Sequence, residues 1–119
     1  MDNISNPSKK PNILMIATGG TIASLQGENG YTPAITSEEI LSKVPQVATF
    51  CTVETLQLFN LDSTNIAPCH WLAISQTLED NYQKYDGFVI THGTDTMAYT
   101  AAALSYLVQQ SPKPIVITG

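Results

Sequence analysis

Arginine is absent from this chain of 119 residues, and its five basic residues are all lysines. Arginine is the residue best suited to bidentate contacts with phosphate groups and guanine bases. The formal net charge of -5 also opposes binding to the backbone of a nucleic acid. We therefore expect no nucleic-acid partner.

Cysteine is scarce too, since only Cys51 and Cys69 occur. Two isolated cysteines do not make a disulfide framework, and reduced thiols are typical of a cytosolic protein. The apolar run from Ile13 to Ala17 is too short for a signal peptide or a membrane span. These absences predict a cytoplasmic protein without an export signal or a membrane anchor.

The composition that remains is that of a folded domain, with 43% hydrophobic and 13% charged residues. A chain of this length has room for one hydrophobic core. We interpret residues 1–11 as a polar N-terminal tail and residues 12–119 as part of one domain. Because residues 114–119 read as a buried strand that runs into a turn, we expect the domain to continue beyond them.

Apolar segments alternate with segments of helical periodicity along the chain. The predicted strands are Ile13–Ala17, Val53–Phe59, Gly87–Ile90 and Ile115–Thr118. The predicted helices are Pro68–Tyr85, Asp95–Gln110 and a weaker one over Ser37–Lys43. This alternation predicts an α/β fold with a parallel sheet covered on both faces, a three-layer arrangement of the Rossmann-like or flavodoxin-like kind. Right-handed crossovers then bring the polar residues that follow each strand to one edge of the sheet.

The first of these polar segments is Thr18-Gly19-Gly20-Thr21. Its glycines allow a sharp turn and a close approach to a ligand, and its hydroxyls can donate, accept or attack. A plain Gly-Gly turn flanked by threonines is an equally good interpretation. Nucleotide binding is disfavoured, because neither a P-loop nor the Gly-x-Gly-x-x-Gly spacing is present.

The second polar segment, residues 60–65, contains Asp62, Ser63 and Thr64. Hydroxyl and backbone N–H groups at Ser63 and Thr64 can bind a carboxylate. A turn that leads into the helix beginning at Pro68 explains the same residues equally well.

The third polar segment, residues 91–96, directly precedes a predicted helix. Thr94 or Asp95 could simply cap that helix. The free N–H groups of a helix N-terminus also suit an anion or a developing oxyanion, and a nearby carboxylate can hold an ammonium group. For His92 we favour a structural role over a catalytic one, because no Gly-x-Ser-x-Gly motif accompanies it.

Two further features have ordinary explanations. Cys69 and His70 are consecutive, so on a helix we expect their side chains to diverge, and we predict no metal site. Tyr31 follows the polar, glycine-containing residues 26–30, which we interpret as a mobile loop. A surface position is the common outcome for such a tyrosine, and a lid residue is the alternative.

Taken together, residues 17–23, 62–63 and 86–97 resemble the bacterial-type L-asparaginases in order and at similar spacing. The resemblance covers residues 12–119, nearly the whole chain, but corresponds only to the opening part of an intact member. It implies the N-terminal portion of the larger asparaginase domain, without the remainder of that domain or the smaller C-terminal domain. It also implies hydrolysis of L-asparagine to L-aspartate and ammonia, with no cofactor.

The resemblance further implies individual roles. Thr21 matches the nucleophile that forms an acyl-enzyme, and Tyr31 matches the loop tyrosine that assists it. Thr94 matches the second threonine, which works with Asp95 and a lysine in proton transfer. Around these, the implied substrate-binding residues hold the carboxylate, amino group and oxyanion of the substrate: Asp62, Ser63, Thr64, Gly93 and Asp95.

The resemblance implies that this lysine belongs to a segment beyond Gly119. Lys84 and Lys113 do not match it, because neither follows a predicted strand at the ligand edge. We therefore expect residues 1–119 alone to be inactive. The run from Asp62 to Thr64 and the run from Met97 to Ala101 resemble the cytoplasmic type I branch. The family also implies a homodimer or homotetramer, in which a neighbouring chain completes the site.

Two alternatives remain. The amidase component of an archaeal-type glutamyl-tRNA amidotransferase shares these motifs, but it has a domain before the first motif, where this chain has only residues 1–11. A non-catalytic α/β module could instead use Thr18–Thr21 and Thr91–Asp95 to hold a small ligand.

Overall fold

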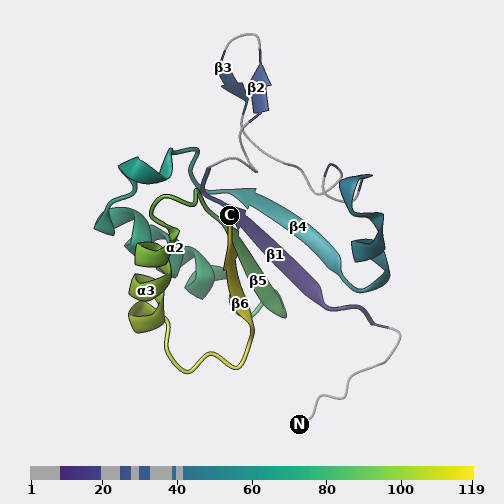
Figure 1. The fold of residues 1–119 in the computed structure, drawn as a ribbon. Coiled ribbons are helices and arrows are strands. Elements are labelled where there is room, and N and C mark those ends of the chain that lie inside the picture. Colours follow the sequence, from purple (N-terminus) through teal and green to yellow (C-terminus); the bar gives the residue numbers. More distant parts are fainter. Residues whose placement is uncertain (1–8, 20–24, 28–29, 33–38, 40–41) are drawn as a thin grey trace.

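A parallel sheet of four strands forms the centre of the computed structural model, which describes residues 9–19, 25–27, 30–32, 39 and 42–119 (Figure 1). The strands are β1 (Asn12–Ala17), β4 (Thr52–Gln57), β5 (Gly87–Thr91) and β6 (Ile115–Thr118). Their spatial order is β4-β1-β5-β6, and every neighbouring pair is parallel. The predicted α/β class and parallel sheet are confirmed.

Two helices complete the crossovers between these strands. Helix α2 (Pro68–Asn81) connects β4 to β5, and α3 (Met97–Leu107) connects β5 to β6. The two helices contact each other, and their buried faces join alternate residues of the sheet in one hydrophobic core. The buried members of this core are Leu14, Ile16, Ile74, Leu78, Phe88, Ile90 and Leu104. Of the three predicted layers, the described residues form the sheet and this layer of helices.

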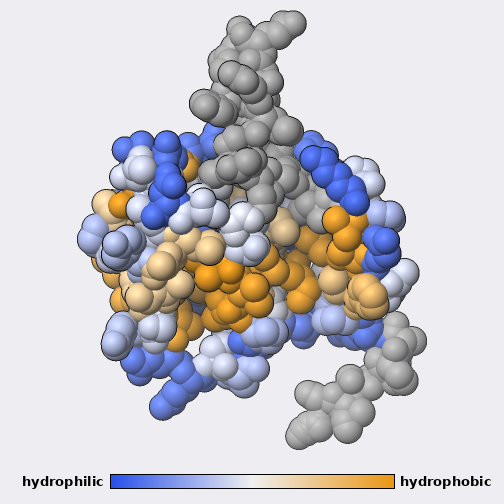
Figure 2. All heavy atoms as spheres, viewed as in Figure 1, coloured by the Kyte–Doolittle hydropathy of each residue, from blue (hydrophilic) through white to orange (hydrophobic). Residues whose placement is uncertain are grey.

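The side chains that alternate with the core residues point to the opposite face of the sheet. The strand register aligns Met15 with Val89, and Val89 with Val116, which is 51% exposed. Figure 2 shows hydrophobic residues gathered over the positions of β5 and β6 in the middle of that view. This second face is therefore apolar as well, as expected for a sheet of the doubly covered type.

Several predicted boundaries are wrong by a few residues. The second predicted strand extended to Phe59, but β4 ends at Gln57 because the N–H groups of Leu58 and Phe59 both turn to the carbonyl of Ala17. The helix predicted to reach Tyr85 ends at Asn81, where the chain forms a turn that leads into β5. The next predicted helix spanned Asp95–Gln110, whereas α3 occupies only its central part.

The predicted loop over residues 26–30 is partly wrong. Strands β2 (Leu25–Gly27) and β3 (Gly30–Thr32) pair as an antiparallel hairpin, in which Gln26 lies opposite Tyr31. The weak helix predicted over Ser37–Lys43 falls largely outside the described residues. Its described positions, residues 39, 42 and 43, are helical and precede the short 3-10 helix η1 (Pro45–Thr49).

The amino edge of the sheet, opposite the ends that carry the polar segments, is tied together by hydrogen bonds. The N–H of Asn12 donates to the Asp86 carboxylate at 2.7 Å, and the N–H of Asp86 donates back to the Asn12 carbonyl. The hydroxyl of Tyr85 donates to the carboxylate of Glu54 at 2.5 Å, and this bond raises the pKa of Tyr85. These bonds fix where β1 and β5 begin.

Among the described residues, no helix is both long and apolar enough to cross a membrane.

Candidate active site

Segments that follow all four strands meet at the carboxyl edge of the sheet. Gly19, after β1, packs on Leu61, after β4, so closely that an added Cβ would lie 2.5 Å from the Leu61 nitrogen. Gly93, after β5, packs on Ser63, where an added Cβ would lie 2.8 Å from the Ser63 Cβ. Gly119, after β6, lies against the methyl group of Thr94. The expected convergence is therefore observed for the described parts of these segments.

The start of the first polar segment has a structural role. Thr18 is 1% exposed, and its hydroxyl donates to the Thr91 carbonyl at 2.7 Å. Gly19 adopts a φ of +119°, a conformation that glycine reaches without a steric penalty. Together these features turn the chain sharply at the end of β1. Thr21 lies outside the described residues, so its role as nucleophile stays a prediction.

In the second segment, one predicted binding residue is used by the turn itself. The Asp62 carboxylate accepts the N–H of Thr64 at 3.1 Å and so caps the short 3-10 helix η2 (Ser63–Asn65). Ser63 is only 3% exposed, yet its hydroxyl makes no hydrogen bond within the part of the chain that the structure describes. That hydroxyl is therefore available to a ligand that enters from the carboxyl edge.

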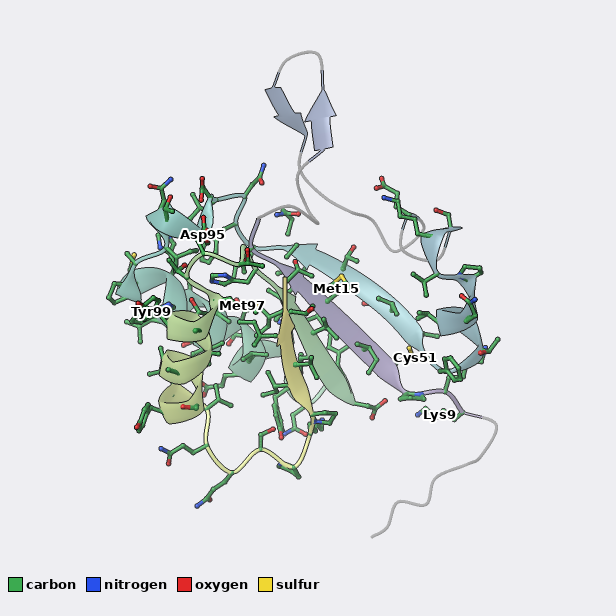
Figure 3. The ribbon with its side chains drawn as sticks, in the orientation of Figure 1. Lys9, Met15, Cys51, Asp95, Met97 and Tyr99 are labelled. Carbon is green, nitrogen blue, oxygen red and sulfur yellow. The ribbon has the colours of Figure 1, made fainter. Side chains whose placement is uncertain are left out.

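The third segment presents Thr94 and Asp95 to the outside. Both are exposed, and neither side chain forms a hydrogen bond or an ion pair with a residue among 9–19 or 42–119. The N-cap of α3 is Thr96, whose hydroxyl donates to the carbonyl of Ser63 at 2.8 Å and does not cap the helix. The capping interpretation of Thr94 and Asp95 is therefore wrong. Figure 3 shows Asp95 at the carboxyl edge, beyond the first turn of α3.

His92 lies beneath this segment, 2% exposed. Its backbone N–H donates to the Thr118 carbonyl at 2.9 Å, and its ring bonds to Gly93 and to Thr100 of α3. The favoured structural role of His92 agrees with these contacts. Thr96 and Thr100, which hold the segment, were missed by sequence reasoning, because their partners lie on other elements and no local motif identifies them.

None of the lysines among the described residues contacts Thr94 or Asp95. Lys113 lies at the amino edge, where its ammonium donates to the carbonyls of Tyr82 and Tyr85 at 2.5 and 2.8 Å. Lys9 lies near the start of β1, also away from Asp95 (Figure 3). The proton-relay lysine implied by the resemblance is therefore not Lys113.

Cys69 and His70 do not diverge as expected, since the Cys69 sulfur lies 3.9 Å from His70 Nδ1. That nitrogen also accepts the N–H of Ala67 at 2.8 Å, which closes the first turn of α2. Within the described ranges, no group of three or more His, Cys, Asp or Glu side chains could hold a metal ion.

The contact between Gly93 and Ser63 yields a first prediction. Replacing Gly93 with alanine puts a methyl group 2.9 Å from the Ser63 hydroxyl, so that hydroxyl has to move. We expect a loss of about 1–3 kcal/mol of stability from overpacking and, if the activity implied by the resemblance holds, a KM for asparagine that is raised roughly tenfold. Steady-state kinetics and urea unfolding of the full-length variant measure both. An unchanged KM would show that Ser63 does not contact the substrate.

A comparison with protein families matches residues 12–119 to the model described as Asparaginase, N-terminal. Among curated proteins, an L-asparaginase of Thermococcus kodakarensis is 44% identical over 112 residues, which cover 90% of this chain and 33% of that protein. A component of the glutamyl-tRNA(Gln) amidotransferase of Archaeoglobus fulgidus is 40% identical over 111 residues, covering 92% of this chain and 26% of that protein.

Solved structures agree with these matches. The crystal structure of L-asparaginase I from Vibrio cholerae superposes with a TM-score of 0.77 at 36% identity, covering 92% of this chain and 34% of that protein. The chain thus spans about a quarter to a third of the length of the relatives that it matches.

Proposed function

Because this chain belongs to the asparaginase family, we propose that it supplies the nucleophile and the substrate-binding groups for the hydrolysis of L-asparagine to L-aspartate and ammonia. The observation that carries this proposal is a set of polar groups at the carboxyl edge of the sheet that make no hydrogen bond within the described residues. Within the described residues, the hydroxyls of Thr94 and Ser63 and the carboxylate of Asp95 make no hydrogen bond or ion pair, and they lie on interlocked segments. Groups held in place but left unpaired are suited to bind a polar ligand.

The substrate is an amino acid with two charged groups and one amide. The Asp95 carboxylate is the matching partner for its ammonium group, since charge-assisted hydrogen bonds of this kind are strong. The Ser63 hydroxyl binds its carboxylate. Asp62 supports Ser63 by capping η2. The side-chain amide of the substrate is assigned to the remaining hydroxyls, Thr21 and Thr94, as the family resemblance implies.

The chemistry then follows that of an activated hydroxyl. Thr21 attacks the amide carbon and forms an acyl-enzyme, and ammonia leaves with a proton from the surrounding acid–base groups. Water then attacks the ester and releases aspartate. Thr94 takes part in proton transfer with Asp95 and with a lysine from outside residues 1–119, and Tyr31 assists Thr21. No metal ion or cofactor takes part in these steps.

We also propose a subfamily, a location and an assembly state for the protein. The match to an L-asparaginase I supports the type I branch. The cytoplasmic location is proposed because the sequence resembles that branch. We also propose a homodimer or homotetramer whose neighbouring chain completes the site, as the family resemblance implies. Because a lysine from elsewhere is needed, residues 1–119 alone are proposed to be inactive.

The direct test is ammonia release from L-asparagine by the full-length protein. Release of one aspartate for each ammonia supports the proposal, and a wild-type protein that releases no ammonia contradicts it. The same assay applied to residues 1–119 should show no turnover.

A substitution at Asp95 tests the substrate contact separately. Asp95→Asn removes the charge but keeps the shape of an exposed side chain that has no partner among the described residues. We expect KM for asparagine to rise roughly 10- to 100-fold, as the loss of a charge-assisted hydrogen bond of about 1.5–3 kcal/mol implies. Asp80→Asn on the exposed surface of α2 is the matched control and should leave KM unchanged. A KM that stays at its wild-type value in Asp95→Asn would rule out this contact.

A second candidate function is the amidase role of a tRNA-dependent amidotransferase, because the chain is 40% identical to a component of such an enzyme. In that case the amide nitrogen would pass to glutamate attached to tRNA. Assays with glutamyl-tRNA(Gln) as acceptor and with water as acceptor separate the two functions. The first candidate is favoured if free asparagine is hydrolysed at full rate without any tRNA.

A further inference from the structure

We propose that three hydrogen-bonded side chains, Trp71, Thr100 and His92, form a positioning relay that fixes the orientation of the peptide group between Gly93 and Thr94. The relay connects both helices to the third polar segment of the candidate site. Its catalytic consequence rests on the proposed amide hydrolysis. None of the three side chains is a catalytic residue, since they act through the backbone next to Thr94.

The relay is continuous and buried at its centre. The indole nitrogen of Trp71 in α2 lies 2.9 Å from the hydroxyl of Thr100 in α3, and that hydroxyl lies 2.8 Å from Nε2 of His92. The other ring nitrogen of His92, Nδ1, lies 2.6 Å from the carbonyl oxygen of Gly93. Thr100 is 0% exposed and His92 is 2% exposed, so water does not compete for the central bond between them.

The chemistry of the groups gives the relay one direction. The carbonyl of Gly93 can only accept, so Nδ1 of His92 is the donor to it. The neutral ring then carries its proton on Nδ1, and Nε2 is an acceptor. With that tautomer the Thr100 hydroxyl donates to Nε2, and its oxygen accepts from the indole N–H of Trp71.

The carbonyl of Gly93 and the N–H of Thr94 belong to one planar peptide group. The described chain contains no cis peptide bond, so this carbonyl and this N–H point in opposite directions. Glycine leaves the peptide group free to rotate unless something else holds it. His92 holds the carbonyl on the protein side, which directs the N–H of Thr94 away from the core.

A fixed N–H beside the reacting amide is suited to stabilise a developing oxyanion. Such donors accelerate a reaction only if they are oriented before the charge develops. The relay therefore acts on the transition state more than on the bound substrate. Its loss should lower kcat and leave KM for asparagine nearly unchanged.

The main test uses Thr100→Val in the full-length protein, which removes the central hydroxyl and keeps the shape of the side chain. We expect kcat to fall roughly 10- to 100-fold with KM within about twofold, less than the loss of a whole oxyanion donor. Thr100→Ser keeps the hydroxyl and should recover most of kcat. Thr77→Val is the matched control, because the hydroxyl of Thr77 bonds only to the Ala73 carbonyl within α2 at 2.8 Å.

A second test does not depend on activity. Nitrogen-15 NMR of the histidine rings distinguishes the two neutral tautomers, and His70 provides an internal reference. Nδ1 of His70 accepts the N–H of Ala67, so His70 should carry its proton on Nε2, opposite to His92. Replacing each histidine with glutamine assigns the signals. The relay predicts an Nδ1–H signal for His92, and Thr100→Val should shift it.

The outcomes separate the relay from the proposed reaction. If the wild type hydrolyses asparagine and Thr100→Val keeps its kcat, the positioning role is overturned. An Nε2–H tautomer at His92 also overturns it. If the wild type releases no ammonia, the proposed reaction fails, and the tautomer of His92 alone decides whether the relay exists. Should Thr100→Val not fold, Trp71→Phe breaks the outer bond of the relay and should lower kcat to a smaller extent.

Discussion

Replacing Thr21 with valine is expected to remove nearly all turnover of asparagine. Valine has the shape of threonine but no hydroxyl, so no acyl-enzyme can form. Loss of a nucleophile lowers kcat by roughly 10⁴-fold or more in hydrolases that use covalent catalysis. Because Ser63 and Asp95 are untouched, the variant should still bind aspartate, the product. Ammonia release gives the kinetic effect, and calorimetric titration with aspartate gives the binding.

The matched control for Thr21→Val is Thr49→Val. Thr49 is exposed in η1, and its hydroxyl bonds to the Gln46 carbonyl within the same short helix. This control should keep the kcat of the wild type. A Thr21→Val variant that retains a tenth or more of wild-type kcat would exclude Thr21 as the nucleophile. If the wild type bound aspartate but had no turnover, a binding module would be the better description.

Replacing Gly19 with alanine is expected to cause the largest loss of stability among substitutions at the site. The added Cβ would overlap the carbonyl oxygen of Leu61 and lie 2.5 Å from its nitrogen, so only backbone movement can relieve the contact. The φ of +119° adds strain for any residue with a side chain. We expect a loss of about 3 kcal/mol, which combines overpacking with backbone strain.

Urea unfolding followed by circular dichroism measures this loss, and Gly87→Ala is the control. A Cβ at Gly87 would meet the ends of two side chains, Ile13 and Pro114, each at 3.1 Å, and these can shift. Among the described glycines only Gly19 has a positive φ, so Gly87→Ala adds no such backbone strain. The control should lose under about 1 kcal/mol. Equal losses in the two variants would mean that the contact with Leu61 is not rigid.

The architecture of this chain was largely predictable because parallel strands are apolar throughout and helices repeat every three to four residues. The strand over Ile115–Thr118 was predicted with the bounds that the structure shows. Errors occurred where partners from elsewhere decide the ends of elements. Leu58 and Phe59 have strand-like side chains, yet their N–H groups bond to the carbonyl of Ala17, and β4 stops before them.

The candidate site was predictable at the level of segments and less so at the level of roles. Topology alone placed the three polar segments at one edge, and the structure brings their described parts into contact. The sequence did not reveal that the hydroxyl of Thr96 donates a hydrogen bond to the carbonyl of Ser63 instead of capping α3. The relay from Trp71 to His92 could not be predicted from the sequence either, because it joins residues from two helices and a strand end that share no motif.

The strand order has a consequence for how the chain folds as it is synthesised. The interior strand β1 is made before its partners β4 and β5, which begin only at Thr52 and Gly87. Until those residues have left the ribosome, the edges and both apolar faces of β1 have no native partner. Sheets built from contacts between residues far apart in the sequence form slowly and expose apolar segments during folding. The segment from β1 to β4 is therefore open to non-native contacts until β5 emerges.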